Sequence, residues 1–443
     1  MDDALSLGID FGTTNTVIAA ATGGDDARLV TYDAPDGSLF AFRSALSFQA
    51  PPDRPADRTI LAGPWALEAY AEDPGETRFL QSFKSYAAQS SFTETQILNR
   101  RYRFEDLLST FLLKLKDHAG SQLADLPRRA IVGRPVVFAG SAPDEALALE
   151  RYETAFRRMG FDEVLYAYEP VGAAFFFARG LTADATVLVG DFGGGTSDFS
   201  IIRFERIGSE EGGGEMRAIP LGRAGVGVAG DAFDYRIIDS LVSPELGKGS
   251  DYTAFGKVLP VPGRYYAAFA RWDQLALMRG GKDMREIRRL VRDAVEPEKL
   301  ARLVEVLDEN LGYRLYRAVS GLKMALSTGD RAEFRFEAGS ISIVRDVARA
   351  DFEGWIAPEL LAIEGAVDQA LADANLTAAG IDRVFLTGGS SLVPAVRDIF
   401  YRRFSSDVIE TGAELESIAS GLALMGRERQ LDRWTTQVDT ASA

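Results

Sequence analysis

The chain has 443 residues, a length typical of about three domain-sized units, and 46% of them are hydrophobic, which is enough for sizeable cores. Lys and Arg number 49 against 65 Asp and Glu, so the net charge is −16. This balance argues against broad binding to nucleic acid or to an anionic membrane, since either would need a basic face. A local basic pocket for phosphates is still compatible with it.

Two residue types limit the chemistry. There is no cysteine, which excludes disulfides, thiolate catalysis and Cys-ligated zinc, and the single histidine, His118, excludes a multi-His metal site. His118 ends an amphipathic stripe in a predicted helix at 104–119, so a structural or surface role is the simpler interpretation. The chemistry must therefore come from Asp, Glu, Lys, Thr and a bound metal.

We expect neither a secretory signal nor a membrane-spanning segment in this sequence. Its first residues are acidic and run directly into a predicted strand, so we expect no secretory signal. No apolar stretch reaches the roughly 18 residues that a membrane span needs. We therefore expect a cytoplasmic protein.

In chain order, the first strong pattern is a strand, a turn and a second strand within residues 5–20. Its sequence is Leu7-Gly-Ile-Asp-Phe-Gly-Thr-Thr-Asn-Thr-Val17. Asp10 ends the first strand, and glycine and small polar residues follow it. Such a turn can offer N–H and hydroxyl groups to an anion, with the carboxylate beside a hydrated Mg²⁺.

Short strands and helices alternate up to residue 185. Lys84 lies among the aromatic residues of Arg78–Tyr86, and a surface lysine is the simpler alternative for it. Glu169 lies where a strand meets a helix that starts after Pro170, and a helix N-terminal carboxylate is the simpler alternative there. The other expected elements are strands at 28–32, 130–138 and 162–168, a turn at 35–37, extended pieces at 38–62, and helices at 64–100, 104–119 and 141–159.

Residues 187–204 predict a hairpin whose tip is Asp191-Phe-Gly-Gly-Gly-Thr196. Three adjacent glycines let backbone N–H groups approach an anion, because no Cβ blocks them. The alternative to an anion-binding turn is a flexible hairpin tip without a ligand. However, Asp191 corresponds to Asp10, and a motif duplicated half a chain apart predicts two similar domains that face each other across one ligand.

The C-terminal half contains two further glycine patterns. Gly225-Val-Gly-Val-Ala-Gly230 fits the dinucleotide fingerprint but lacks a preceding buried apolar strand, which makes it a weak signal. Arg383–Arg397 predicts a strand, a Gly-Gly turn and a helix, where N–H groups could hold a sugar or phosphate. The other expectations are a loop tip at 211–214, helices at 233–242, 311–326, 352–374 and 415–428, a helix-rich segment at 243–320 with a solvated basic face at 285–292, strands at 334–336 and 340–344, and a frayed polar tail from 430.

Five ordered motifs resemble those of the actin/hexokinase/heat-shock-70 superfamily over about residues 5–428. The two phosphate motifs are Asp10-Phe-Gly-Thr-Thr-Asn15 and Asp191-Phe-Gly-Gly-Gly-Thr-Ser-Asp198, and the adenosine motif is Leu386-Thr-Gly-Gly-Ser390. Tyr168–Ala174 and Glu416–Gly421 are similar to the family's two connecting segments. The Gly-Gly-Gly-Thr run and the Glu-Pro pair resemble most closely the heat-shock-70 ATPase domain, and within it the YegD-type chaperones.

The resemblance implies an α/β, two-lobed actin-like ATPase fold of duplicated ribonuclease-H-like domains, with ATP in the cleft between the lobes. The family's interdomain linker, peptide-binding domain and lid are expected to be absent. The implied boundaries are lobe I at 1–185 (core 1–37 and 103–185, inserted subdomain 38–102), lobe II at 186–430 (core 186–232 and 325–430, inserted helical subdomain 233–324) and a polar tail at 431–443.

The resemblance also implies roles for individual residues. Asp10 and Asp191 would position Mg²⁺ through its waters, Lys84 would stabilise charge on the γ-phosphoryl group, and Glu169 would orient the attacking water. Thr196 completes the implied catalytic set. The implied nucleotide-binding residues are Gly12, Thr13, Thr14, Asn15, Gly193, Gly194, Gly195, Gly230, Lys323, Met324, Gly388, Gly389, Ser390 and Leu392.

Three positions depart from the family. Met324 and Leu392 stand where the family stacks arginines on adenine, and Ser320 replaces a glutamate near the ribose, whereas Lys323 matches the family lysine. An apolar sandwich could still hold a purine, but these changes bear on base preference and affinity.

The favoured function is Mg-dependent binding and slow hydrolysis of ATP by a chaperone-like nucleotide switch. Its partners would be the nucleotide and protein clients or co-chaperones, with no nucleic acid and no membrane. A small-molecule kinase of the same superfamily is one alternative. An actin-like filament or a non-hydrolysing scaffold is the other.

Overall fold

A computed structural model describes the chain except for residues 1–5, 22–25, 35–36, 52–56, 74–75, 141, 208–214, 271–277, 279–280, 413–414, 427, 429 and 439–443. The described residues form two compact units. Unit 1 contains residues 1–229, 362–391 and 397–443, and unit 2 contains residues 230–361 and 392–396. Most of the expected turn at 35–37 and the whole loop tip at 211–214 lie outside the described residues.

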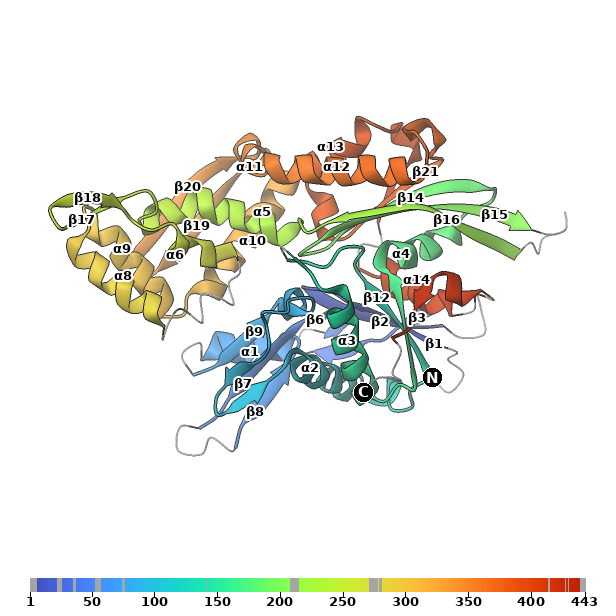
Figure 1. Ribbon diagram of the computed structural model, residues 1–443, viewed down its shortest axis with the longest axis horizontal. Helices are drawn as coiled ribbons and strands as arrows, with labels where there is room; N and C mark the ends of the chain where they lie inside the picture. Colours follow the sequence, from blue (N-terminus) through green and yellow to red (C-terminus); the bar gives the residue numbers. More distant parts are fainter. Residues whose placement is uncertain are drawn as a thin grey trace. The chain divides into compact units, whose positions relative to one another are not determined.

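The first sheet of unit 1 is built on the N-terminal hairpin. β1 (Ser6–Phe11) pairs antiparallel with β2 (Asn15–Ala21) and parallel with β12 (Arg129–Arg134), which pairs in turn with β13 (Glu163–Tyr168). Alternate side chains of β1 and β2 pack on α2 (Phe104–Ala119) and α3 (Glu145–Met159), and the opposite face of β2 packs on α14 (Ser417–Met425) (Figure 1). Asp10 therefore emerges at the end of a strand that is fixed on both faces.

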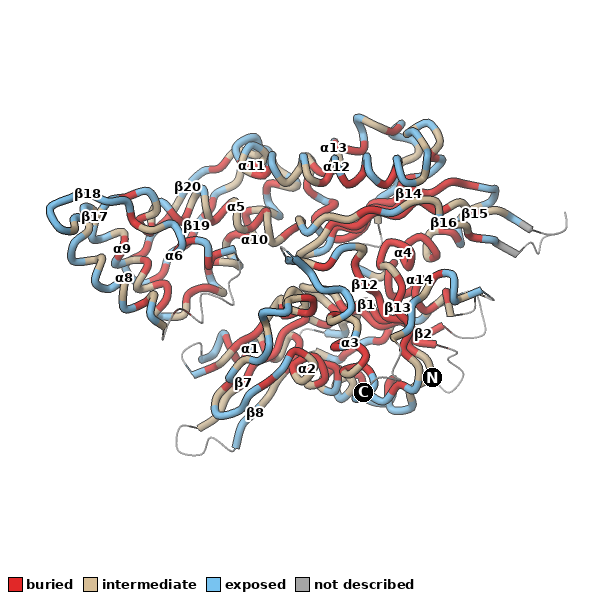
Figure 2. The backbone as a smooth tube through the Cα atoms, viewed as in Figure 1, coloured by how far each residue is buried: buried red, intermediate tan, exposed pale blue. Residues whose placement is uncertain are grey.

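The second sheet of unit 1 is built on the predicted hairpin at 187–204, which is confirmed. β14 (Ala185–Phe192) pairs antiparallel with β15 (Ser197–Ile207) and parallel with β21 (Arg383–Thr387). β16 (Glu215–Val226) and β22 (Ile409–Thr411) form the two edges. β14 is buried along its whole length, as Figure 2 shows, so Asp191 also ends a rigid strand.

The two predicted connecting segments, at 168–174 and 416–421, begin helices that pack against each other in unit 1. α4 (Glu169–Ala178) and α14 pack so closely that a Cβ at Gly421 would lie 1.7 Å from the carbonyl oxygen of Gly172. A Cβ at Gly8 on β1 would lie 2.1 Å from the carbonyl oxygen of Ala419. Only glycine permits these approaches, which tie both helices to the strand that carries Asp10.

The expected helix at 64–100 is wrong beyond Glu72. α1 spans Pro64–Glu72, and the chain then continues through short strands and one 3₁₀ turn. Pro74 explains the stop, since proline cannot continue a helix and pushes the residue before it out of helical geometry; Asp73 has φ −139°. The remaining elements here are β3 (Ala27–Leu29), β4 (Tyr32–Ala34), β5 (Gly37–Leu39), β6 (Phe42–Arg43), β7 (Ala45–Gln49), β8 (Thr59–Ala62), β9 (Arg78–Gln81), the turn Phe83–Tyr86, β10 (Thr95–Ile97) and β11 (Arg100–Tyr102).

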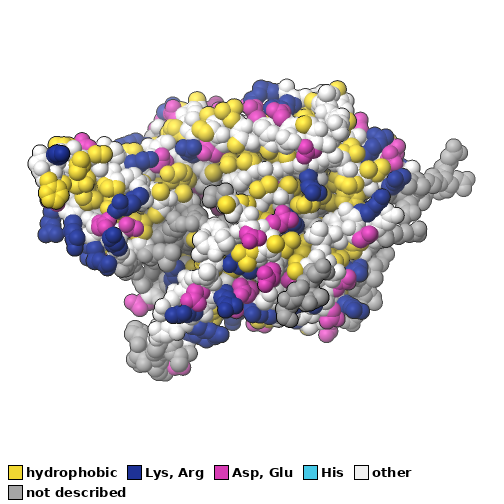
Figure 3. Space-filling view, viewed as in Figure 1, with side chains coloured by type: hydrophobic (Ala, Val, Ile, Leu, Met, Phe, Trp, Pro, Cys, Tyr) yellow, Lys and Arg dark blue, Asp and Glu magenta, His cyan; other side chains and the backbone are white. Residues whose placement is uncertain are grey.

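The described residues of unit 2 form a group of helices, one long hairpin (β19–β20) and one short hairpin (β17–β18). Its elements are α5 (Gly230–Ile237), β17 (Asp251–Ala254), β18 (Lys257–Pro260), α6 (Arg264–Ala267), α8 (Lys282–Asp293), α9 (Pro297–Asp308), α10 (Gly312–Thr328), β19 (Arg331–Ala338), β20 (Ile341–Ala348), α11 (Arg349–Trp355) and the start of α12 (Ala357–Asp373). The β17–β18 hairpin was not expected, and its tip residue Phe255 is fully exposed with φ 52°. Arginines of α8 at 285, 289 and 292 are exposed, and basic side chains gather over this end of unit 2 (Figure 3).

The expectation of a frayed C-terminal tail is wrong for residues 431–438. Thr435 and Thr436 form β23, which pairs antiparallel with β13. Trp434 is buried, and its ring lies 5.3 Å from that of Phe175 on α4. Trp434 thus joins the tail to the hydrophobic cluster of α4, the helix that begins at Glu169.

Candidate active site

The two Asp-Phe-Gly turns are closed by the same hydrogen bond. In the first turn the Gly12 N–H donates to the Asn15 carbonyl at 3.0 Å, and in the second the Gly193 N–H donates to the Thr196 carbonyl at 3.0 Å. The Ser44 hydroxyl also donates to the Gly12 carbonyl at 2.7 Å, which fixes the first turn further. The equivalence proposed from sequence between these turns therefore extends to their backbone geometry.

The two turns come together although they belong to different sheets. A Cβ at Gly195 would lie 3.7 Å from the Thr13 hydroxyl oxygen and 3.8 Å from the Ala139 side chain. The glycine run thus leaves its backbone open beside a hydroxyl residue of the other turn. This is the arrangement that the duplicated motif predicts for an anion held from two sides.

The third glycine turn adjoins the second one. Gly388 has φ 83°, and a Cβ there would lie 2.3 Å from the Phe192 carbonyl oxygen, so only glycine fits. The Ser390 hydroxyl donates to the Gly193 carbonyl at 3.4 Å. A Cβ at Gly389 would meet nothing within 4 Å, so its backbone is open.

Lys84 and Glu169 form a buried ion pair in unit 1. Lys84 Nζ lies 2.7 Å from Glu169 Oε1, and their side chains are only 10% and 6% exposed. Glu169 is the first residue of α4, and Lys84 lies in the 3₁₀ turn Phe83–Tyr86. Burial alone would lower the pKa of Lys84, but the Glu169 carboxylate raises it overall, so the lysine stays charged.

Arg151 of α3 holds the segment that follows Lys84. Its guanidinium is buried and donates to four backbone carbonyls, those of Tyr86, Ala87, Gln89 and Phe92, at 2.6 to 3.3 Å. The rigid guanidinium fork suits such a cluster of acceptors. The ammonium of Lys84 is therefore placed by a backbone that α3 fixes.

The carboxylates of Asp10 and Asp191 resist ionisation in this site. Burial and the nearby Glu169 raise the pKa of Asp10 to about 7, which Lys84 partly counteracts. Burial, Glu169 and Asp10 raise the pKa of Asp191 well above its usual range. A divalent cation would relieve this repulsion.

Asp198 is a site residue that the sequence reasoning missed. It is fully buried on β15, and its Oδ1 accepts from the Val136 N–H at 2.7 Å and the Val137 N–H at 3.3 Å. Burial and Glu169 raise its pKa to about 7. The sequence did contain a signal for this residue, because Asp198 ends the second phosphate motif and lies at a buried position of the strand.

The Gly225–Gly230 pattern has a structural explanation. Gly225 lies within β16, and a Cβ there would come within 2.5 Å of Asp198 Oδ1 and 3.1 Å of the Val136 side chain. This glycine is thus required by the packing of a carboxylate. His118 has a structural place as well, with its ring stacked 3.7 Å from that of Trp65.

The remaining predicted nucleotide residues lie in unit 2. Lys323 Nζ lies 2.8 Å from Asp234 Oδ1 and donates to the Gly230 carbonyl at 3.2 Å, while the Ser320 hydroxyl lies 3.4 Å from Asp234 Oδ2. Met324 is 67% exposed and Leu392 is 42% exposed, unusually high values for large apolar side chains. Both are therefore accessible to a ligand.

The donor set of unit 1 fits a Mg²⁺ ion bound mainly through water and phosphate. Mg²⁺ in phosphate sites keeps several waters and takes one or two carboxylates, a number that Asp10 and Asp191 supply. Within the described ranges, no group of three or more His, Cys, Asp or Glu could hold a metal by itself. In the same part of the chain, no helix is long and apolar enough to cross a membrane.

Comparisons with known proteins point in one direction. A family model described as Hsp70 protein matches residues 279–430. The chain is 26% identical to the Chaperone protein DnaK of Thermus thermophilus, over 97% of this chain and 62% of that protein, and the DnaK proteins of two strains of this organism match with the same figures. The chain thus spans less than two thirds of the length of these relatives. Together with the mixed α/β architecture, these matches support an Hsp70-like ATPase domain with an actin-like fold.

Proposed function

We propose that this chain binds Mg·ATP, hydrolyses it slowly and acts as an Hsp70-like nucleotide switch. The observation that carries the proposal is the approach of the two Asp-Phe-Gly turns, at 3.7 Å between the Gly195 Cβ position and Thr13 Oγ1. A phosphate chain placed there would meet open backbone N–H groups on one side and hydroxyls on the other.

In this proposal the two core sheets are the cores of two lobes, divided at residues 185 and 186. Thr13, Thr14 and Asn15 would contact the β- and γ-phosphates from one lobe, and Gly193–Thr196 from the other. For the ribose and base, the residues that the resemblance assigns are Gly388–Ser390 in unit 1 and Lys323, Met324 and Leu392 in unit 2. The motif sequences also resemble those of YegD-type chaperones, and this resemblance favours Mg·ATP as the ligand.

The buried ion pair supplies the proposed chemistry. When bound, Mg²⁺ would supply a charge that neutralises phosphate oxygens, held by Asp10 and Asp191 through water. Lys84, charged and buried, would stabilise charge that develops on the γ-phosphoryl group. Glu169 would orient the water that attacks, which needs positioning more than a strong base.

A chaperone-like role follows from the same relatives. The Thermus proteins are named as chaperones, so protein clients or co-chaperones are the partners we propose for this chain. ATP would favour one arrangement of the domain, and a partner would recognise that arrangement. The cytoplasm is the compartment we propose.

Calorimetry with ADP and ATP, with and without Mg²⁺, tests the proposal first. We expect tight Mg-dependent binding and slow turnover, with Asp191→Asn abolishing turnover and the exposed Asp293→Asn behaving as wild type. Lys84→Ala should lower turnover far more than affinity, and equal loss of both would remove its proposed role. Rapid phosphorylation of a sugar or polyol would identify a kinase instead, and Mg·ATP-dependent light scattering would identify a filament.

A further inference from the structure

Tyr152 on α3 carries a buried hydroxyl that no described residue satisfies. The side chain is fully buried, and its phenol oxygen has no hydrogen-bond partner. Leaving a buried polar group unpaired costs about 1–3 kcal/mol, and a phenylalanine of nearly the same shape would avoid that cost. The hydroxyl therefore works against the stability of the free protein.

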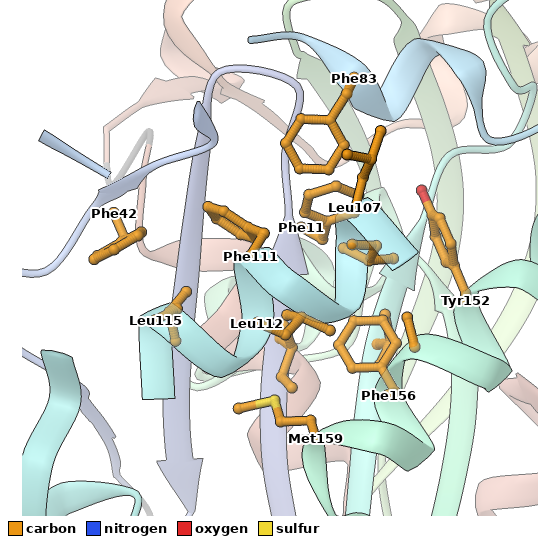
Figure 4. Close-up of a cluster of buried hydrophobic side chains, with 14 of the residues drawn as sticks. Phe11, Phe42, Phe83, Leu107, Phe111, Leu112, Leu115, Tyr152, Phe156 and Met159 are labelled. Carbon is orange, nitrogen blue, oxygen red and sulfur yellow. The ribbon is translucent and has the colours of Figure 1, made fainter. Parts of the chain in front are cut away.

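The hydroxyl lies on the Lys84 side of the core. The Tyr152 ring packs 5.8 Å from the ring of Phe11, and Lys84 Nζ lies 5.9 Å from the centre of that same ring. Figure 4 shows the phenol oxygen directed away from Phe156 and toward the end of the cluster where Phe11 and Phe83 lie. Phe83 directly precedes Lys84.

The neighbouring residue already organises the same segment. Arg151 holds the backbone after Lys84 through four carbonyls, so this turn of α3 is fixed against the lysine-bearing turn. The lysine itself still has spare hydrogen-bonding capacity. An ammonium has three donors, and the one hydrogen bond described for Nζ is with Glu169.

We propose that the Tyr152 hydroxyl is a positioning group that accepts a hydrogen bond from Lys84 when nucleotide occupies the site. In the free protein the ammonium is held by Glu169. A γ-phosphate would draw it away from that carboxylate, and the phenol oxygen would then fix its new direction. The inference rests on the proposed function and adds a residue to it.

A neutral acceptor suits this position. Glu169, Asp10 and Asp191 already place three carboxyl groups near this lysine. Burial raises the pKa of Tyr152, so the phenol stays protonated. It can therefore accept from the ammonium without adding a fourth negative charge.

Tyr32 provides a matched control. It is also fully buried with an unpaired hydroxyl, but it packs on Phe42, at 4.8 Å between ring centres. Tyr152→Phe and Tyr32→Phe each remove one orphan oxygen, so both should melt at or above the wild-type temperature. Only Tyr152→Phe should lower kcat, by about three- to tenfold, with the ADP affinity unchanged within twofold.

A second measurement does not depend on turnover. In a crystal structure with a non-hydrolysable ATP analogue, the Tyr152 oxygen should lie within hydrogen-bond distance of Lys84 Nζ. The inference is overturned if the hydroxyl remains alone there, or if Tyr152→Phe and Tyr32→Phe both turn over ATP at the wild-type rate. If the wild-type chain hydrolyses no ATP, the proposed function fails and the inference falls with it.

Discussion

Replacing Lys84 by methionine should destabilise the free protein strongly and in a pH-dependent way. Lys84 interacts with the buried carboxyl groups of Glu169, Asp10 and Asp191, and its side chain is only 10% exposed. Removing one partner of a buried pair costs about 3–5 kcal/mol, because the other charge is left unpaired. At about 2.1 cal/mol/K of unfolding entropy per residue, that corresponds to a fall in Tm of about 5–8 °C for unit 1.

The sign of the pH dependence follows from the raised pKa values. Asp10 and Asp198 ionise near 3.8 when unfolded and at about 7 when folded, so the folded protein keeps protons that the unfolded chain releases between these values. Stability therefore falls as pH rises across this window. Loss of Lys84 raises the folded pKa of Asp10 further, so the deficit of the variant should be larger at pH 8 than at pH 5.5.

The assay is thermal unfolding by circular dichroism, without nucleotide, at pH 5.5 and pH 8.0. The double variant Lys84→Met, Glu169→Gln should recover part of the loss, because it removes the unpaired charge as well. A Tm for Lys84→Met equal to wild type at pH 8, or a deficit of the same size at both pH values, would refute this electrostatic reasoning.

Three further predictions follow from single contacts. Asp198→Asn keeps an oxygen that can accept from the Val136 and Val137 N–H groups but carries no charge. The free energy of unfolding, measured with denaturant, should therefore rise by up to about 4 kcal/mol above pH 7, and this gain should vanish near pH 4. A gain independent of pH would contradict the raised pKa of Asp198. Burial lowers the pKa of His118, so an NMR titration of this sole histidine should give a pKa below 6.5. The contribution of His118 to stability should be lost as pH falls through that range. An ordinary or raised pKa would mean that the ring is not enclosed. Gly8→Ala would place a Cβ 2.1 Å from the Ala419 carbonyl oxygen, so it should lower the free energy of unfolding by several kcal/mol or prevent folding. Gly227→Ala is the control and should be near neutral, because its Cβ would meet nothing within 4 Å. Similar melting temperatures for the two variants would contradict the packing of α14 on β1.

Much of the fold could be predicted because its signals are local. The stripe of apolar residues at helical spacing predicts residues 104–119, and α2 has those bounds. The two hairpins with Asp-Phe-Gly turns were likewise evident from strand, glycine and strand. The duplication then predicted that the turns meet, and they lie within contact distance in unit 1.

What could not be predicted depends on contacts distant in sequence. The β17–β18 hairpin has only four residues a strand, too few for a periodic signal, and an exposed phenylalanine at its turn runs against local preference. Trp434 looked like part of a polar tail until α4 supplied its packing partner. Asp198 lies in a predicted strand and Tyr152 in a predicted helix, and the local sequence does not show what surrounds either side chain. Only the tertiary structure reveals that one is a buried carboxylate and the other an unpaired hydroxyl.

The central claim, that the two Asp-Phe-Gly turns hold one magnesium-bearing phosphate chain, is tested most directly by calorimetry of ADP binding in the presence and absence of Mg²⁺, on the wild type and on Asp191→Asn. The account predicts tight binding that weakens at least tenfold without Mg²⁺ and loses its Mg²⁺ dependence in the variant. Binding of equal strength in all these conditions, or no binding at all, would contradict it.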